Sequence, residues 1–169
     1  MKDSLRFISH YSEQTISEVK KLIEHGKLKE YLLHKYPNAH MIKTDKSLFE
    51  YAIELKNTFM KKSAPLSKVV YDGKIHVIDN ALGTHHFISR VQGGKLKAKN
   101  MISIATLFKN VPEDFLRMIV IHELAHFKEK EHNKAFYKLC THMETDYHQL
   151  EFDCRLYLIH LELFGTLYK

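Results

Sequence analysis

The residues best suited to chemistry lie in the segment His122-Glu123-Leu124-Ala125-His126. Two histidines spaced by four residues lie on the same face of an α-helix, one turn apart. Both imidazoles can then reach one zinc ion at about 2.0–2.1 Å. Glu123 lies about 100° round the helix axis from His122, where it can hold a water molecule and accept its proton without being a ligand. The segment therefore predicts a zinc site on His122 and His126, with Glu123 as the general base.

A third ligand is expected because a hydrolytic zinc site usually has three protein ligands and leaves its fourth position to water. His132 follows His126 by six residues and can return to the metal if the helix ends soon after Lys128. The polar residues 128–131 suit such an exit, and Asn133 can cap the next helix. This spacing favours His132 as the third ligand, with one zinc ion per chain.

Two carboxylates are the alternative third ligands. Glu151 and Asp153 lie on the last predicted helix, which spans Tyr147 to about Phe164. A carboxylate distant in sequence completes the zinc site of some zinc peptidases. Both residues therefore stay open as alternatives, although the sequence favours His132.

The segment that carries the motif is predicted to be a central, buried helix. Apolar residues occur on all sides of it between Phe115 and Phe127, which is typical of a helix inside a protein core. Its expected start has Asn110 as the N-cap and Pro112 in the first turn. Burying three ionisable side chains in such a helix is costly unless they are paired or bind a metal. The surroundings of the motif thus strengthen the metal-site interpretation.

Residues 1–63 are predicted to form a helical extension packed on a catalytic core made of residues 64–169. Apolar residues at helical spacing indicate a helix after a capping box at Thr15, a short helix over residues 28–34 and a third over residues 46–61. None of these helices carries a catalytic motif. We therefore expect the extension to be a packing layer or a wall beside the substrate.

Two hairpins are predicted between residues 65 and 105, where the hydrophobic pattern changes from helical to strand-like. The first joins residues 69–71 to 75–78 through Asp72-Gly73, and the second joins residues 87–91 to 96–104 through Gly93-Gly94. The expected result is an α+β fold, with a small, mostly antiparallel sheet packed on the active-site helix.

The composition of the 169-residue chain indicates one compact domain with a core of its own. Two cysteines are too few for a disulfide framework, and no signal peptide or apolar run of roughly 20 residues occurs. A soluble, cytoplasmic protein without a membrane partner is expected. The net charge of +6 can attract nucleic acid, but the lysines are scattered rather than clustered, so a solvated basic surface is the simpler interpretation.

Residues 119–137 resemble the active-site motif of the YgjP-like metal-dependent hydrolases, relatives of the SprT and Spartan-type zinc peptidases. In that family a third histidine, a small polar residue and an aromatic pair follow the first two histidines. Here those places are held by His132, Asn133 and Phe136-Tyr137, and Asp146-Tyr147 matches an Asp-Tyr pair of the family. The resemblance implies a zincin-like fold, a catalytic acid/base at Glu123 and zinc ligands at His122, His126 and His132.

The chain departs from the family pattern ahead of the motif. Many members carry an Arg-Trp-Gly-Ser-Cys segment before the preceding strand, whereas this chain has Gln92-Gly93-Gly94-Lys95 and no tryptophan. The departure leaves the metal ligands in place and concerns the segment expected beside the substrate.

A zinc peptidase acting on a peptide or protein is the function that these residues predict. By analogy with zincins, the extended substrate would pair with a strand edge, for which Lys97–Ile104 is the candidate. Tyr147 or Arg155 would stabilise the oxyanion, and the sequence does not select between them. The alternative is a basic DNA-associated zinc protein, either a Spartan-like protease or a non-catalytic binder. No zinc-finger spacing or cluster of arginines supports that alternative.

Overall fold

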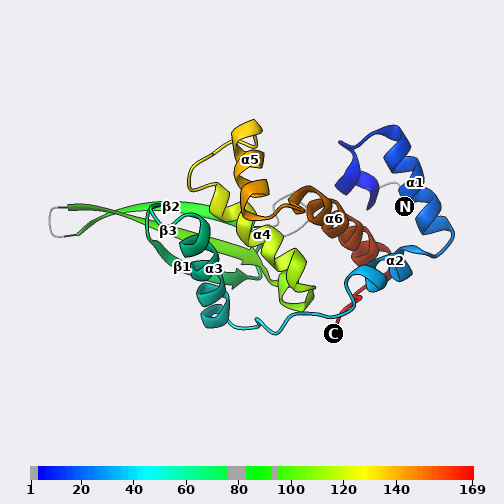
Figure 1. Cartoon of the computed structure of the whole chain (residues 1–169). Coiled ribbons are helices and arrows are strands. Elements are labelled where there is room, and N and C mark those ends of the chain that lie inside the picture. Colours follow the sequence, from blue (N-terminus) through cyan, green and yellow to red (C-terminus); the bar gives the residue numbers. More distant parts are fainter. Residues whose placement is uncertain (1–3, 76–82, 93–94) are drawn as a thin grey trace.

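The computed structural model describes residues 4–75, 83–92 and 95–169, with residues 83–92 and 95–99 as backbone (Figure 1). Its helices are η1 (Ser4–Ile8), α1 (Glu13–Glu24), α2 (Leu28–Lys35), α3 (Asp45–Phe59), η3 (Thr106–Asn110), α4 (Glu113–Ala125), α5 (Lys134–Met143) and α6 (Tyr147–Phe164). Its strands are β1 (Leu66–Asp72), β2 (Gly83–Gln92) and β3 (Lys95–Ala105). Figure 1 shows the sheet at one end of the molecule, α4 in the middle, and α6 with α1 and α2 at the other end. Mixed helices and a small sheet confirm the predicted α+β class.

The sheet has the strand order β1-β3-β2. Strands β2 and β3 pair antiparallel, with Gln92 opposite Lys95, so the second predicted hairpin is confirmed. Strand β1 instead runs parallel to β3, with Val69 opposite Ile102. The prediction of a mostly antiparallel sheet is therefore wrong for β1, and the sheet is mixed. Residues 76–78 of the first predicted hairpin lie outside the described residues.

Strand β3 is the central strand, which corrects the prediction that Lys97–Ile104 forms a sheet edge. Its two sides pair with β1 and β2, so its backbone groups are already hydrogen-bonded within the sheet. Ile102 and Ile104 on β3 are fully buried. An added substrate strand would have to pair with β1 or β2 instead.

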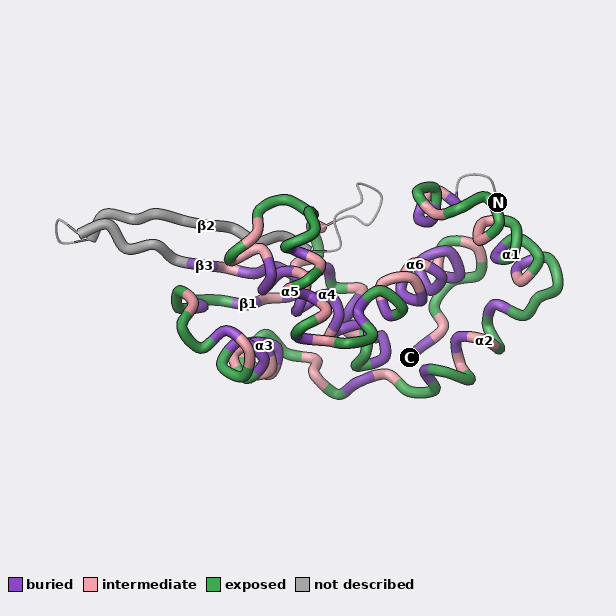
Figure 2. Tube along the Cα trace, turned by 45° about the horizontal axis from the view of Figure 1, so that its top comes forward, coloured by how far each residue is buried: buried purple, intermediate pink, exposed green. Residues whose placement is uncertain are grey.

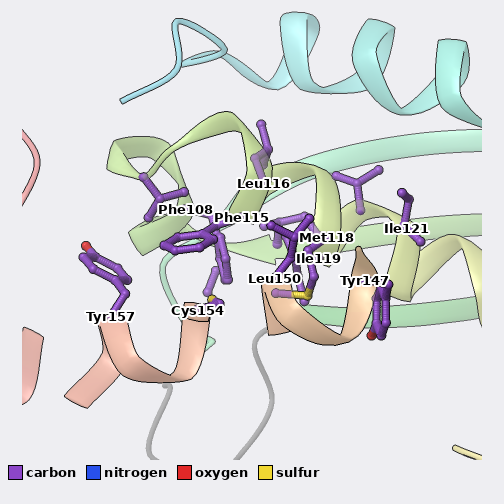
Figure 3. Packing of buried hydrophobic residues seen from close by; sticks show 14 of the residues in the cluster. Phe108, Phe115, Leu116, Met118, Ile119, Ile121, Tyr147, Leu150, Cys154 and Tyr157 are labelled. Carbon is purple, nitrogen blue, oxygen red and sulfur yellow. The ribbon is translucent and has the colours of Figure 1, made fainter. Parts of the chain in front are cut away.

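Helix α4 forms the centre of the hydrophobic core, as predicted from its apolar residues. It contacts the sheet, α3, α5 and α6, and buried residues follow one another along it (Figures 2 and 3). The fully or nearly fully buried apolar residues of α4 are Phe115, Leu116, Met118, Ile119, Val120, Ile121, Leu124 and Ala125. The N-cap is Pro112, and not Asn110, which ends the preceding helix η3. Glu113 and Asp114 in the first turn favour this start, because acidic side chains stabilise a helix N-terminus.

Most of the other helix boundaries lie within two residues of their predictions, and α6 has the predicted bounds. The exception is the start of α1, where Ser12 rather than Thr15 is the N-cap and its hydroxyl accepts a hydrogen bond from the Thr15 backbone N–H. Ser12 therefore has the capping role that was predicted for Thr15. No helix in the described part of the chain is long and apolar enough to cross a membrane.

Helix α6 connects the N-terminal helices to α4. Its residue Asp153 is fully buried and accepts hydrogen bonds from the hydroxyls of Tyr31 and Tyr36, at 2.8 and 2.7 Å, and from Lys35 Nζ at 2.6 Å. These three donors lie in or next to α2, so one carboxylate ties α2 to α6. The buried hydrophobic cluster includes residues from both sides of position 63, and the predicted division into residues 1–63 and 64–169 stays a prediction.

Candidate metal centre

Three histidines from two neighbouring segments converge on one point. Nε2 of His132 lies 3.1 Å from Nε2 of His122 and 3.2 Å from Nε2 of His126. One nitrogen of each ring lies within 4.8 Å of the other two. Tetrahedral ligands at about 2.0–2.1 Å from one ion are about 3.3–3.4 Å from one another. The spacing of the three nitrogen atoms therefore fits one tetrahedral metal ion.

The early end of α4 brings the third histidine to the other two. Helix α4 ends at Ala125, and His126 is its C-cap residue, so the helix is about one turn shorter than predicted. The backbone N–H groups of Lys128 and Glu129 donate to the Ala125 carbonyl at 3.0 and 3.1 Å, which turns the chain tightly at this point. The turn allows His132 to face α4, as the predicted helix exit required.

Helix α5 supplies the apolar support beneath the histidines. Asn133 caps this helix by accepting a hydrogen bond from the Phe136 backbone N–H at 2.9 Å. The buried ring of Phe136 lies 4.9 Å from the ring of His122, 4.7 Å from that of His126 and 4.8 Å from that of His132, between centroids. One aromatic side chain thus packs against all three imidazoles and restricts their rotation.

The outer nitrogen atoms of two histidines have fixed partners. Nδ1 of His126 lies 2.9 Å from the Glu129 carbonyl, which can only accept, so this nitrogen carries the proton. Nδ1 of His122 lies 2.7 Å from the Tyr147 hydroxyl, which can accept a hydrogen bond from it. In the tautomer that has its proton on Nδ1, the Nε2 atom of each of these histidines has a lone pair available at the shared centre. Metal-binding histidines usually have such a partner on the opposite nitrogen.

Burial and neighbouring charges favour the neutral imidazoles of His122 and His132. Burial, followed by the charges of His126 and His132, lowers the pKa of His122 to about 3. Burial also lowers the pKa of His132, as does the charge of His126. Neutral imidazole is the form that binds a metal. A single N–H of His132 can point at only one of the two facing lone pairs, so a cation satisfies this cluster better than protons do.

Glu123 lies next to His122 and is 2% exposed. Burial raises the pKa of its carboxyl to about 8. A cation held by the three histidines would oppose this effect, because a nearby positive charge favours the carboxylate. The predicted general base is therefore in a site where its proton affinity depends on the metal.

The two alternative carboxylate ligands are occupied elsewhere. Asp153 accepts hydrogen bonds from α2, and Glu151 accepts one from Arg155 Nη2 at 3.1 Å. Within the described residues, the group with metal-ligand spacing consists of His122, His126 and His132 alone.

Tyr147 and Arg155, the two candidates for stabilising the oxyanion, have different surroundings in the structure. Tyr147 is fully buried and hydrogen-bonds the outer nitrogen of His122, away from the shared centre. Arg155 keeps a side chain that is 23% exposed. The sequence had assigned no role to the packing of Phe136 or to the Tyr147 partner. Only the spacing of these two residues from the histidines could have indicated such roles. That spacing is informative only when the positions of α5 and α6 are known.

Comparisons with known proteins agree with this geometry. A family model described as YgjP-like, metallopeptidase domain, matches residues 89–152. A protein of Escherichia coli (strain K12) named UTP pyrophosphatase is 58% identical over 160 residues, which cover 95% of this chain and 96% of that protein. No solved structure matches the chain significantly. Both names denote hydrolases, and the family description denotes a metal-dependent one. The chain belongs to the YgjP-like family of metal-dependent hydrolases.

Proposed function

We propose that this protein is a zinc-dependent hydrolase that cleaves UTP to UMP and pyrophosphate. The proposed substrate is inferred from the 58% identity, over 95% of the chain, to the E. coli protein named UTP pyrophosphatase. The proposed chemistry is supported by the convergence of the three histidine nitrogens and by the buried Glu123, which follows His122 in α4. A basic chain, with a net charge of +6, also suits a substrate with several negative charges.

His122, His126 and His132 would hold the ion through their Nε2 atoms. A bound zinc ion supplies a Lewis acid and lowers the pKa of a water molecule towards about 7. Tyr147 and the Glu129 carbonyl orient the rings of His122 and His126 from outside. Phe136 packs against all three rings and supports their positions.

Glu123 is the proposed general base. The oxygen of the attacking water forms a bond to the α-phosphorus, while the bond from that phosphorus to the α–β bridging oxygen breaks. The electron pair of the broken bond leaves with pyrophosphate. Glu123 accepts one proton from the water and can return it to the leaving group. UTP and water are thus converted to UMP and pyrophosphate without any further reactant.

The test is UTP hydrolysis by the zinc-loaded protein, with UMP and pyrophosphate measured by chromatography. Glu123→Gln keeps the shape of the side chain but removes the proton acceptor. This variant should retain zinc and lose hydrolysis at least about 10²-fold, the lower end for a general base. Absence of UTP hydrolysis by the wild type would contradict the proposed substrate. Undiminished hydrolysis by a zinc-containing Glu123→Gln variant would contradict the role of Glu123.

A zinc peptidase is the second candidate, because the matching family model is described as a metallopeptidase domain. Its chemistry would use the same four residues, with the peptide carbonyl in place of the phosphate. The central position of β3 weighs against the expected mode of peptide binding, since both of its edges are paired. Digestion of a peptide library by the same zinc-loaded preparation separates the two substrates. The DNA-associated alternative stays a prediction that neither comparison addresses.

A further inference from the structure

A row of side chains on α6 begins at the metal centre and continues along the helix. Tyr147, Glu151 and Arg155 are spaced by four residues, so they follow one another along nearly the same side of the helix. Tyr147 contacts His122 at the start of this row. With a rise of about 1.5 Å per residue, Arg155 lies roughly 12 Å further along the helix. An arginine side chain that extends back along the helix can cover much of that distance.

The guanidinium of Arg155 has two hydrogen-bond partners in the protein, but some of its N–H donors have none. Its Nη1 donates to the Phe7 carbonyl at 3.0 Å, and its Nη2 donates to Glu151 Oε1 at 3.1 Å. The buried Nε has no hydrogen-bond partner. A guanidinium has five N–H donors, so several of those of Arg155 remain for a ligand. Leaving a buried donor without an acceptor costs free energy, so the protein partners of Arg155 do not fully satisfy its guanidinium.

The N-terminal segment borders this part of α6, where the Tyr11 ring packs edge-on against Phe152 at 5.0 Å between centroids. Burial raises the pKa of Tyr11 and Tyr137. The charge of Glu151 adds to this effect, and the charge of Arg155 opposes it. Side chains of the N-terminal segment and of α5 therefore lie near the Glu151–Arg155 pair.

We propose that Arg155 is a second anion-binding point of the active site and receives the β- and γ-phosphates of the nucleotide. This inference rests on the proposed function, because it assumes that the α-phosphate lies at the metal centre. Arginine suits the role, since its planar donors match phosphate oxygens in pairs. Negative charge grows on the pyrophosphate as it leaves, and a fixed cation there stabilises that charge.

Glu151 has a defined part in this arrangement. It orients the guanidinium through one nitrogen and offsets part of its charge, so that Arg155 holds pyrophosphate without retaining it too tightly. Removing the charge of Glu151 should therefore strengthen the binding of a polyphosphate, whereas removing that of Arg155 should weaken it. Opposite effects from two residues in one ion pair would not arise from a simple loss of structure.

The experiment measures pyrophosphate binding to the zinc-loaded protein by calorimetry, together with the KM for UTP. Arg155→Gln should weaken pyrophosphate binding and raise the KM by at least about 10-fold, the effect of losing one hydrogen bond between charged groups. Its zinc content should not change. Glu151→Gln, whose amide oxygen can still accept from Arg155, should bind pyrophosphate several-fold more tightly than the wild type.

Arg117→Gln is the matched control. Arg117 is also a partly buried arginine that donates to one carboxylate, Glu144, at 2.6 Å and to one carbonyl, that of Met143, at 3.2 Å. Its loss should change pyrophosphate binding less than about two-fold. Equal losses in Arg117→Gln and Arg155→Gln would overturn the inference, as would unchanged binding in Arg155→Gln or weaker binding in Glu151→Gln.

The outcomes also separate this inference from the proposed function. If Arg155→Gln hydrolyses UTP with the KM of the wild type, the second anion-binding point is wrong and the proposed substrate stands. If the wild type binds pyrophosphate through Arg155 but hydrolyses only peptides, the anion-binding point stands and UTP is the wrong substrate.

Discussion

The hydroxyl of Tyr147 lies 2.7 Å from Nδ1 of His122, while Nε2 of the same ring faces Nε2 of His132 at 3.1 Å. The tyrosine therefore orients the histidine ring from the side opposite the nitrogen that faces the other two histidines. This hydrogen bond links α6 to the metal centre.

Tyr147→Phe tests this relationship. The substitution removes one oxygen atom and leaves the Nδ1–H of His122 without its acceptor, so zinc affinity should fall by about 10- to 100-fold. Competition with a chelator of known affinity measures the change. Tyr157→Phe is the control, because Tyr157 is a buried tyrosine of the same helix that packs against Tyr168 and Phe115 instead. Equal affinities in the wild type and Tyr147→Phe would show that the hydrogen bond does not support the ligand.

The third ligand is tested by metal content. The protein isolated without chelator should contain about one zinc ion per chain, as one site with three protein ligands implies. His132→Ala should lose most of this zinc, whereas Glu151→Ala and Asp153→Ala should retain it, because the two carboxylates lie outside the histidine cluster. Elemental analysis after dialysis gives the answer. Zinc retained in His132→Ala and lost in one of the carboxylate variants would reverse the assignment.

Removing the metal should also lower the stability of the fold. The three histidines lie in the native structure at a spacing that fits one ion, so zinc should bind the folded chain in preference to the unfolded one. Free zinc at 100 times its Kd would stabilise the fold by about 2.7 kcal/mol. Thermal unfolding with zinc and with excess chelator measures the difference. In His122→Ala the two melting temperatures should coincide, and a difference that persists there would place the stabilising zinc elsewhere.

The buried carboxylate of Asp153 should contribute strongly to stability. Asp153→Ala leaves the hydroxyls of Tyr31 and Tyr36 without their acceptor and the ammonium of Lys35 without its ion-pair partner, which should cost about 3 kcal/mol. Urea unfolding of the zinc-loaded protein measures this free energy. Glu50→Gln breaks only an exposed pair with Lys46, at 4.0 Å, and should cost close to zero. Similar losses in the two variants would mean that the link between α2 and α6 is not a main source of stability.

The sequence predicted that His122, His126 and His132 lie close together, because the signals for this arrangement are local. The spacing of His122 and His126 needs only one helical turn, and the polar residues after α4 need only a short return to His132. Burial of α4 followed from apolar residues on all of its sides. The helix ends later in the prediction than in the structure, because the pattern of apolar residues continues to Phe127 whereas the backbone turns at Ala125.

The features that the sequence did not predict depend on distant partners. Side chains of β1 alternate between the two faces of the sheet whether the strand pairs in a parallel or an antiparallel direction. The hydrophobic pattern therefore does not show that β1 runs parallel to a strand about 30 residues later. The partner of Tyr147 likewise depends on how α6 packs against α4. A tyrosine at the start of a helix gives no sign of whether its hydroxyl will face a substrate or a ligand of the metal.

The direction of α4 has a consequence for the order in which ligands bind. The helix points its C-terminus at the histidine cluster, with His126 as the cap. The carbonyl end of a helix macrodipole carries about half a negative charge, which attracts cations and repels anions. An anionic nucleotide that approaches before the ion therefore meets an unfavourable field from the helix itself. Once the ion is bound, the net charge at the site is positive and attracts an anion. The dipole of α4 therefore favours an order in which the metal binds first and the substrate second.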